Sequence, residues 1–312
     1  MIPGLADADG FFLRRDVIAA GGTDRHLLRS RKRGEIIRVR QGVYCLTSRW
    51  SELSASDRHA ALCRSVLPLY SGMVALSHVS AAVAHGAPTW GLDLREVHLT
   101  SLDGAGERTV ALVRHHRGVC RVGDVTRRDG RWITTPTRAA LEVALVSPRD
   151  PAVAVLDWFL QQRLTTLDAL LGLAEQMRQW PDSLHVSAVL GLADGRSESV
   201  AETRTRLLIA DAGLPDPVPQ LEILDRRGRV IARVDFAWPE YGLIVEFDGE
   251  IKYRALRRAG ESIEDCVLRE KRREDAVREA TGWRVLRLTW RDLDHPAETA
   301  QRIRAALRRP AA

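Results

Sequence analysis

The sequence lacks the features that would place its 312 residues in a membrane, secreted or zinc-stabilised class of protein. No apolar run approaches the roughly 18 to 20 residues of a transmembrane helix, and no basic stretch followed by an apolar one marks a secretory signal at the N-terminus. The four cysteines stand far apart without a C-x-x-C pair, which argues against a cysteine zinc site and a disulfide framework. Internal repeats and low-complexity tracts are absent as well. We therefore expect a cytoplasmic globular protein with reduced thiols and two or three domains.

The charge of the chain is moderately positive and unevenly placed. Lysine and arginine number 47 against 41 aspartates and glutamates, which gives a formal net charge of +6 at pH 7. Residues 1–50 alone contain ten basic and five acidic residues, a local net charge of +5. Such a module is compatible with nucleic-acid binding, although a modest excess of charge does not by itself require it.

Turn signals and changes of pattern divide the chain into three expected domains. Residues 1–48 form a basic unit, residues 49–190 are mainly helical in pattern with a few strands, and residues 191–312 have the pattern of strands framed by helices. The fold class that follows is α/β, or α+β overall.

The first domain has the plan of a winged helix-turn-helix. Apolar residues from Phe12 to Ala20 recur at helical spacing and end at a glycine pair. Thr23 then suits the N-cap of a second helix, over residues 24–32. We expect Leu27 and Leu28 of this helix to face a small core.

The second helix and the hairpin after it, over residues 36–44, carry basic side chains that can contact DNA. In this plan the helix enters the major groove and the hairpin touches phosphate, and arginine suits both tasks because its planar fork bonds bidentately to phosphate or guanine. The expected contacts are the basic residues of the helix and the wing, Arg25, Arg29, Arg31, Lys32, Arg38 and Arg40. The alternative interpretation is a solvated charged face on a small helical domain.

Two segments of the first 90 or so residues carry a resemblance to a known family: Arg33-Gly34-Glu35-Ile36-Ile37-Arg38-Val39-Arg40-Gln41-Gly42-Val43-Tyr44 and Ser77-His78-Val79-Ser80-Ala81-Ala82. They resemble the N-terminal domain of AbiEi-type antitoxins, the regulatory half of type IV toxin–antitoxin systems. The resemblance implies a winged-helix regulator that binds DNA, with a cognate toxin as its protein partner.

The middle domain carries few functional signals. We expect helices over residues 60–69, 77–85, 138–146, 152–160 and 167–179. We expect strands over residues 96–100 and 109–114. His78 and His85 share a helix face, which suggests a metal site, but no third ligand is evident and packed histidines are the favoured interpretation. His115 and His116 stand among arginines and are predicted to lie on the surface.

The third domain carries a hairpin with acidic residues at facing positions. Residues 229–238 and 243–248 have strand patterns, and the four residues Pro239-Glu240-Tyr241-Gly242 form the turn between them. If the hairpin closes symmetrically, Asp235 faces Glu246.

Facing carboxylates on an antiparallel pair have Cβ atoms about 4.5–5.5 Å apart, so they repel unless one is protonated or a cation lies between them. Mg²⁺ (or Mn²⁺) with oxygen ligands suits such a place. Glu246 and Asp248 point to one face of their strand, so the expected ligands are Asp235, Glu246 and Asp248. The same closure sets Asp248 opposite Arg233, and a cross-strand ion pair is an equal alternative for Asp248.

Helical and strand patterns frame this hairpin. We expect helices over 197–210, 262–279 and 296–307 and a further strand over 283–289. Glu202 lies one turn into the first of these helices. Ser262 with Asp265 resembles a capping box for the second.

Five blocks of the third domain follow one another in a specific order: Asp235-Phe236-Ala237-Trp238-Pro239, Val245-Glu246-Phe247-Asp248-Gly249, Lys252-Tyr253, Glu270-Lys271-Arg272-Arg273-Glu274-Asp275 and Gly282-Trp283-Arg284-Val285-Leu286-Arg287. Together they resemble an uncharacterised actinobacterial domain related to the very-short-patch-repair endonuclease. That resemblance covers about residues 196–295 and implies a restriction-endonuclease-like α/β fold of the PD-(D/E)XK superfamily.

The resemblance also implies roles for single residues. In the superfamily two acidic residues hold Mg²⁺ and a lysine on the second strand activates water. Asp235 and Glu246 match the acidic positions, and Glu202 matches the acidic residue often found on the first helix. The residue two positions after Glu246 is Asp248 instead of lysine, which is a departure from the pattern.

Two lysines are expected to substitute for the missing one. Lys252, a few residues further along, is the first choice, and Lys271 on the following helix is the second. Arg272 or Arg273 is expected to hold the phosphate. The implied reaction is metal-assisted hydrolysis of a phosphodiester.

The sequence therefore predicts two alternative functions. One is a Mg²⁺-dependent DNA endonuclease held on its substrate by the winged helix. The other is an AbiEi-like antitoxin or transcriptional regulator whose nuclease fold cleaves poorly or not at all. Both predict DNA affinity that falls steeply with salt, and neither calls for an organic cofactor or a membrane.

Overall fold

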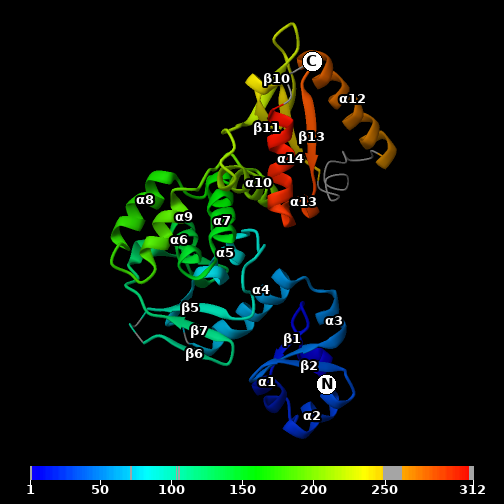
Figure 1. The fold of residues 1–312 in the computed structure, drawn as a ribbon. Coiled ribbons are helices and arrows are strands. Elements are labelled where there is room, and N and C mark those ends of the chain that lie inside the picture. Colours follow the sequence, from blue (N-terminus) through cyan, green and yellow to red (C-terminus); the bar gives the residue numbers. More distant parts are fainter. Residues whose placement is uncertain (1, 71, 103, 105, 249–261, 309–312) are drawn as a thin grey trace. The chain divides into compact units, whose positions relative to one another are not determined.

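Figure 1 shows the fold in a computed structural model, which describes residues 2–70, 72–102, 104, 106–248 and 262–308. The chain forms two compact units, residues 1–193 and residues 194–312. Both units mix helices with strands, so the expected α+β class is confirmed. Within the described part of the chain, no helix has the length and apolar character needed to cross a membrane.

The first unit begins with a small winged helix. Its elements are η1 (Ile2–Leu5), β1 (Phe11–Leu13), α1 (Arg14–Ala19), α2 (Asp24–Lys32), β2 (Ile36–Arg40) and β3 (Val43–Leu46). Strand β3 lies between β1 and β2 and pairs antiparallel with both. The core of this domain is built from five buried residues, Phe12, Val17, Leu27, Ile36 and Tyr44.

Helix α2 has the predicted bounds and the predicted cap. The Thr23 hydroxyl oxygen accepts a hydrogen bond from the His26 N–H, and His26 Nδ1 accepts one from the Thr23 N–H at 3.2 Å. Two details of the prediction are wrong. Phe12 lies in β1 because it pairs with Tyr44 and stacks on its ring. Leu28 is 49% exposed because a short helix on a small sheet buries only the side that carries Leu27.

The remainder of the first unit combines a six-stranded sheet with helices. The helical elements are α3 (Thr47–Glu52), α4 (Ala55–Val66), η2 (Leu67–Leu69), α5 (His78–His85), η3 (Val122–Asp124), α6 (Pro136–Val146), α7 (Arg149–Gln161), α8 (Leu167–Gln176) and α9 (Ser183–Leu190). The strands are β4 (Val74–Leu76), β5 (Val97–Ser101), β6 (Arg108–Val110), β7 (Val113–His116), β8 (Val125–Arg128) and β9 (Arg131–Thr134). Their order in the sheet is β6-β7-β5-β4-β9-β8.

The prediction for this region found its helices better than its strands. The helices expected over 77–85, 138–146 and 152–160 are present as α5, α6 and α7. The single strand expected over 109–114 is a hairpin, because Ala111 and Leu112 turn the chain with φ angles of 48° and 63°. Strands β4, β8 and β9 escaped prediction because three or four residues are too few to show an alternating pattern.

The second unit is a four-stranded sheet covered by helices on both faces. Its elements are α10 (Val200–Asp211), β10 (Val218–Leu224), β11 (Val230–Trp238), η4 (Pro239–Tyr241), β12 (Leu243–Phe247), α12 (Ile263–Thr281), β13 (Arg284–Leu288), α13 (Trp290–Asp294) and α14 (Pro296–Leu307). The order is β10-β11-β12-β13, with β12 and β13 parallel and the other pairs antiparallel. One face packs with α10, α13 and α14 and the other with α12.

The hairpin of β11 and β12 closes in the predicted register. Phe236 pairs with Val245 and Trp238 pairs with Leu243. Regular alternation along a strand would put Val234 and Phe236 on one face. Instead, Val234 belongs to the core on the α12 side and Phe236 to the core on the other side. The alternation therefore breaks at the intervening residue, Asp235.

Candidate nucleic-acid interface and acidic cluster

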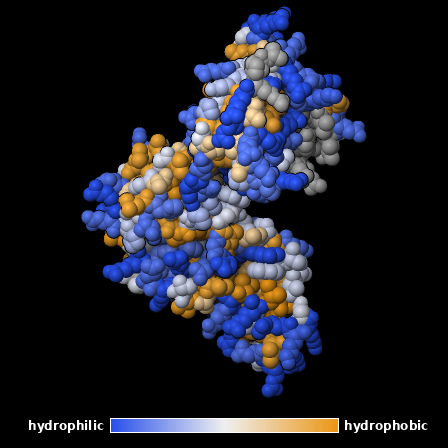
Figure 2. Space-filling view, in the orientation of Figure 1, coloured by the Kyte–Doolittle hydropathy of each residue, from blue (hydrophilic) through white to orange (hydrophobic). Residues whose placement is uncertain are grey.

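Helix α2 presents a basic face to solvent. Arg25, Arg29 and Lys32 recur at steps of four and three residues, so they lie on one side of the helix, opposite buried Leu27. Arg31 flanks this side, and all four basic side chains are exposed. None of them forms an ion pair with another residue in the part of the chain that the structure describes. Figure 2 shows a largely hydrophilic surface over the winged helix.

The wing contributes less than the sequence predicts. Arg38 in β2 is exposed, as expected. Arg40 at the end of β2 is half-buried, and its Nε donates a hydrogen bond to the carbonyl oxygen of Ala111 at 2.6 Å. Burial also lowers the pKa of the Arg40 guanidinium. The structure thus corrects the expectation that Arg40 projects from the wing, because β2 ends against the β6–β7 turn.

Asp235 on β11 and Glu246 on β12 lie at the end of the paired part of the hairpin in the second unit. They follow directly after the Phe236–Val245 pair in the register of the hairpin. The Asp235 carboxylate accepts a hydrogen bond from the backbone N–H of Phe247 at 2.8 Å. The two acids are therefore neighbours on adjacent strands, where the sequence placed them.

The cation beside Glu246 is a side chain of the protein. Arg273 on α12 donates a hydrogen bond from Nη2 to the Glu246 carboxylate at 2.8 Å, and the Glu246 side chain is only 11% exposed. Arg273 was expected to bind phosphate, and its pairing with Glu246 was not predicted. No local pattern relates a strand residue to a helix residue 27 positions later. The adjacent Arg272 is exposed.

Glu202 in α10 joins the acidic cluster through hydrogen bonds. Its carboxylate accepts from Gln220 Nε2 at 2.7 Å, from the Ser199 hydroxyl at 2.9 Å and from the Glu198 N–H at 2.9 Å. Burial raises the pKa of the Glu202 carboxyl, the Glu198 N–H opposes that shift, and the charge of Asp235 adds to it. An effect of that kind requires Asp235 to be near, so Glu202 belongs to the same cluster.

Gln220, which donates a hydrogen bond to Glu202, lies at a strained position. It lies on β10 between the partners of Val234 and Phe236, where the pairing of β10 with β11 skips Asp235. Its φ is 52°, a left-handed conformation that is costly for a residue other than glycine. Neither strand β10 nor a role for Gln220 was predicted from the sequence.

The other residues predicted for this site are Asp248, Lys271 and Lys252. Asp248 directly follows β12, and the ion pair expected between it and Arg233 is replaced by one between Arg233 and Glu198 at 2.6 Å. Lys271 is exposed on α12. Lys252 lies outside the described residues.

The three acidic residues predicted as Mg²⁺ ligands do not converge on one point. Asp235, Glu246 and Asp248 are all described, and they do not come close enough together for three carboxylates to share one ion. The Arg273 guanidinium already bonds to Glu246, and a divalent ion beside it meets like charge. Mg²⁺ therefore stays a prediction from the sequence.

The histidines of the first unit are mostly buried, which corrects the prediction for His115 and His116. These two residues are 2% and 7% exposed, because β7 lies inside the sheet between β5 and β6. His85 does not join His78 in a metal site, since its Nε2 bonds to the carbonyl oxygen of Thr134 at 2.8 Å.

His78 instead meets two histidines from the sheet, His98 in β5 and His116 in β7. The rings of His78 and His116 stack with centroids 3.5 Å apart, and His98 Nδ1 lies 2.9 Å from His116 Nε2. Burial lowers the pKa of His98 to about 4 and that of His116 to about 3. His98 was missed because only the pairing of two strands brings it beside His116.

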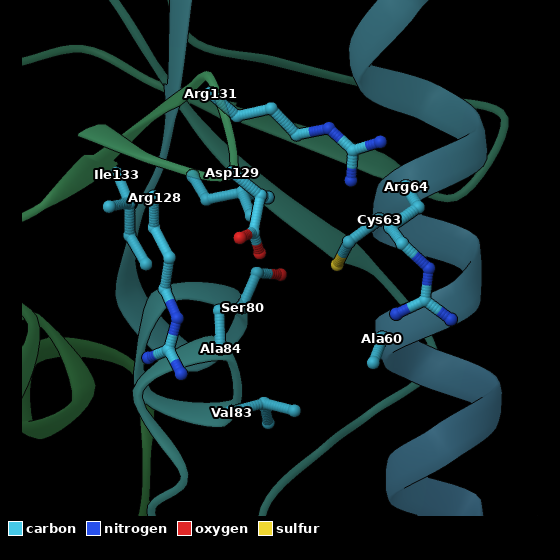
Figure 3. A pocket seen from close by; sticks show the side chains of 11 residues that line it. Ala60, Cys63, Arg64, Ser80, Val83, Ala84, Arg128, Asp129, Arg131 and Ile133 are labelled. Atoms are coloured by element: carbon cyan, nitrogen blue, oxygen red, sulfur yellow. The ribbon is translucent and has the colours of Figure 1, made fainter.

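A cavity of about 230 Å³ opens elsewhere in the first unit (Figure 3). The close view shows arginines around it, with the sulfur of Cys63 directed inward from α4 and Arg128 approaching from the other side. Burial raises the pKa of the Cys63 thiol to about 12, so the thiol stays protonated near neutral pH. The cavity therefore offers no activated nucleophile.

Comparison with known proteins supports the assignment of the N-terminal domain. Residues 5–47 match a family described as "Transcriptional regulator, AbiEi antitoxin", so the AbiEi resemblance is confirmed for the winged helix. The chain is also similar to two uncharacterized proteins of Mycobacterium tuberculosis, MT2308 of strain CDC 1551 / Oshkosh and Rv2248 of strain ATCC 25618 / H37Rv. Each is 30% identical over 276 residues, which cover 87% of this chain and 92% of the relative.

Proposed function

Because this chain belongs to the same family as those two mycobacterial proteins, and its N-terminal domain is of the AbiEi antitoxin family, we propose that it is a DNA-binding transcriptional regulator. The observation that carries this proposal is the exposed basic face of α2, made of Arg25, Arg29 and Lys32. A toxin is the protein partner that the antitoxin family suggests.

The side chains of α2 are suited to both parts of DNA recognition. Arginines bond to phosphates, which gives affinity, and to guanine edges in the major groove, which gives sequence preference. Leu28, 49% exposed, lies on the same side of the helix as Arg25 and Arg29. An apolar side chain there can contact the methyl group of thymine. The exposure of Leu28 is consistent with a helix that enters the groove.

The test of this proposal is a binding titration of the full chain on a labelled DNA duplex at several salt concentrations, read by fluorescence anisotropy. About four or five phosphate contacts predict that the logarithm of the binding constant falls with the logarithm of salt at a slope of roughly −4. Absence of binding at low salt, or a slope near zero, would contradict the proposal. A duplex of unrelated sequence separates general from sequence-specific affinity.

Phosphodiester hydrolysis by the second unit is a second candidate function. The observation that favours it is the grouping of Asp235, Glu246 and Glu202 on adjacent elements. The pairing of Arg273 with Glu246 and the missing lysine at Asp248 disfavour it. For cutting to occur, Arg273 would have to release Glu246.

A plasmid assay separates the two candidates. We expect supercoiled plasmid to stay intact when incubated with the full chain and Mg²⁺ or Mn²⁺, because the carboxylate at the centre of the cluster is bonded to arginine. The Glu246→Ala variant and an EDTA reaction are the controls. Nicking that requires the metal and disappears in Glu246→Ala would establish the nuclease instead.

A further inference from the structure

The ring nitrogens of three buried histidines in the first unit contact one another, the Ser77 hydroxyl and the Glu142 carboxylate, which lies 3.8 Å from His78 Nδ1. His78, His98 and His116 are 4%, 5% and 7% exposed. One ring nitrogen from each lies within 4.8 Å of those from the other two, and this is the one such group of potential metal ligands within the described residues. Buried polar groups normally find hydrogen-bond partners, so a cluster of three imidazoles calls for an explanation.

The fold brings these residues together from three elements. Strands β5 and β7 run parallel as neighbours, and their register sets Thr100 beside His116, so that His98 and His116 project to the same side of the sheet. His78 is the first residue of α5, the helix that packs on β5. The rings therefore meet between the sheet and the start of a helix.

The backbone at His78 is held in a strained form. Its φ is 50°, in the left-handed region that is costly for a residue other than glycine. Its N–H donates to the Glu142 carboxylate at 3.1 Å, which is itself anchored by Arg138 Nε at 2.8 Å. Strain that the surrounding contacts maintain is characteristic of a functional position.

The ring nitrogens are presented as ligands. His78 Nδ1 lies 3.0 Å from the Ser77 hydroxyl, and a hydrogen bond on this nitrogen leaves Nε2 as the ligand atom, the usual arrangement behind a metal-bound histidine. Between His98 Nδ1 and His116 Nε2 only one proton can be shared at 2.9 Å. A cation in place of that proton satisfies both nitrogens at once.

The space beside the cluster is suited to a fourth ligand. A cavity of about 110 Å³ is lined by His78, His116, Thr100 and Glu142, among others. The Thr100 hydroxyl is buried and has no hydrogen-bond partner among the residues that the structure describes. A water or small anion bound to a metal in this cavity would supply that partner.

We propose that His78, His98 and His116 form a site for one divalent transition-metal ion, with Zn²⁺ the preferred occupant. Imidazole ligands select zinc and its neighbours over Mg²⁺ or Ca²⁺. Zinc–nitrogen bonds of about 2.0–2.1 Å in a tetrahedron require nitrogens roughly 3.4 Å apart. The His98–His116 distance of 2.9 Å must open slightly, and the widest separation, within 4.8 Å, must close. The His78 ring must also rotate out of its stack on His116, because a nitrogen lone pair lies in the plane of its ring.

The experiment is a metal titration of the full chain after dialysis against a chelator, with Zn²⁺ followed by calorimetry and Co²⁺ followed by its visible absorption. We expect one equivalent bound per chain and an absorption typical of tetrahedral cobalt. His98→Ala and His116→Ala should weaken binding by more than about 100-fold, since loss of an outer-shell partner alone costs roughly 10–100-fold. His295→Ala is the control, because His295 is exposed on the second unit.

Two outcomes would contradict the proposed metal site. One is a wild-type chain that binds neither metal, and the other is binding that His98→Ala and His116→Ala leave unchanged. Circular dichroism of each apo variant guards against loss of fold, and His116→Gln keeps the volume of the ring region if alanine unfolds the unit. The metal titration does not depend on DNA binding. The proposed metal site and the proposed DNA-binding function can therefore fail independently of each other.

Discussion

Replacing Arg25 and Arg29 together by alanine weakens DNA binding roughly 30-fold or more, at about 1–3 kcal/mol for each arginine that meets the duplex. The two side chains lie one turn apart on the exposed side of α2, opposite Leu27 in the core, so both can reach the same groove. Their loss also lowers the salt slope by about 2 if both contact phosphate. Anisotropy titrations at several salt concentrations measure both effects.

The matched control for this variant is Arg178→Ala. The Arg178 side chain is 74% exposed in the same unit, outside the winged helix, and its ion pair with Glu175 is long at 3.5 Å. We expect unchanged affinity and an unchanged slope. Arg40→Ala is a second control, since Arg40 is committed to the Ala111 carbonyl. An interface elsewhere on the chain would be indicated if the Arg25/Arg29 variant bound like wild type.

Replacing Glu142 by leucine destabilises the first unit by about 3–5 kcal/mol, the usual cost of removing one partner from a buried ion pair. The Glu142 side chain is 0% exposed and the Arg138 side chain 3%. The carboxylate accepts hydrogen bonds from Arg138 Nε at 2.8 Å, the Thr134 hydroxyl at 3.0 Å and the His78 N–H at 3.1 Å. Leucine has similar volume but leaves all three donors short of an acceptor.

Urea denaturation followed by circular dichroism measures this change in the transition of the first unit. Arg138→Met combined with Glu142→Leu should recover part of the loss, because the buried guanidinium is then no longer left with Asp124 as its one carboxylate partner among the described residues. Glu175→Leu on the surface should change the free energy of unfolding by less than about 1 kcal/mol. A Glu142→Leu variant as stable as this surface control would show that the buried pair contributes little.

The clearest success of sequence reasoning lies in the second unit. The alternating pattern of β11 and β12 and the turn between them were sufficient to predict the register of the hairpin, in which Phe236 pairs with Val245, because a hairpin with a short turn has few ways to close. The helix α2 and its Thr23 cap were equally readable, since capping depends on residues three positions apart. Both successes concern interactions that are local along the chain.

The failures concern contacts between elements that are distant along the chain. The sequence contains Arg273 and Glu246, but nothing local says that α12 covers the face of the sheet where Glu246 points. The face of Phe236 does not follow from regular alternation, because an irregularity in β10, a strand that was not foreseen, breaks the alternation at Asp235. Arg40 was assigned to the wing because its burial depends on a hairpin about 70 residues later.

By itself the sequence determined the class of the protein, the basic winged helix at its start, the hairpin of the second unit and the acids that this hairpin brings together. Only the tertiary structure decided which charge stands beside Glu246, how Glu142 is buried, and that His78 meets His98 and His116. The physical reason is the range of the interactions. Periodicity, caps and short turns act over a few residues and leave their mark in the order of the chain. The position of a side chain against another element depends on the packing of the whole core.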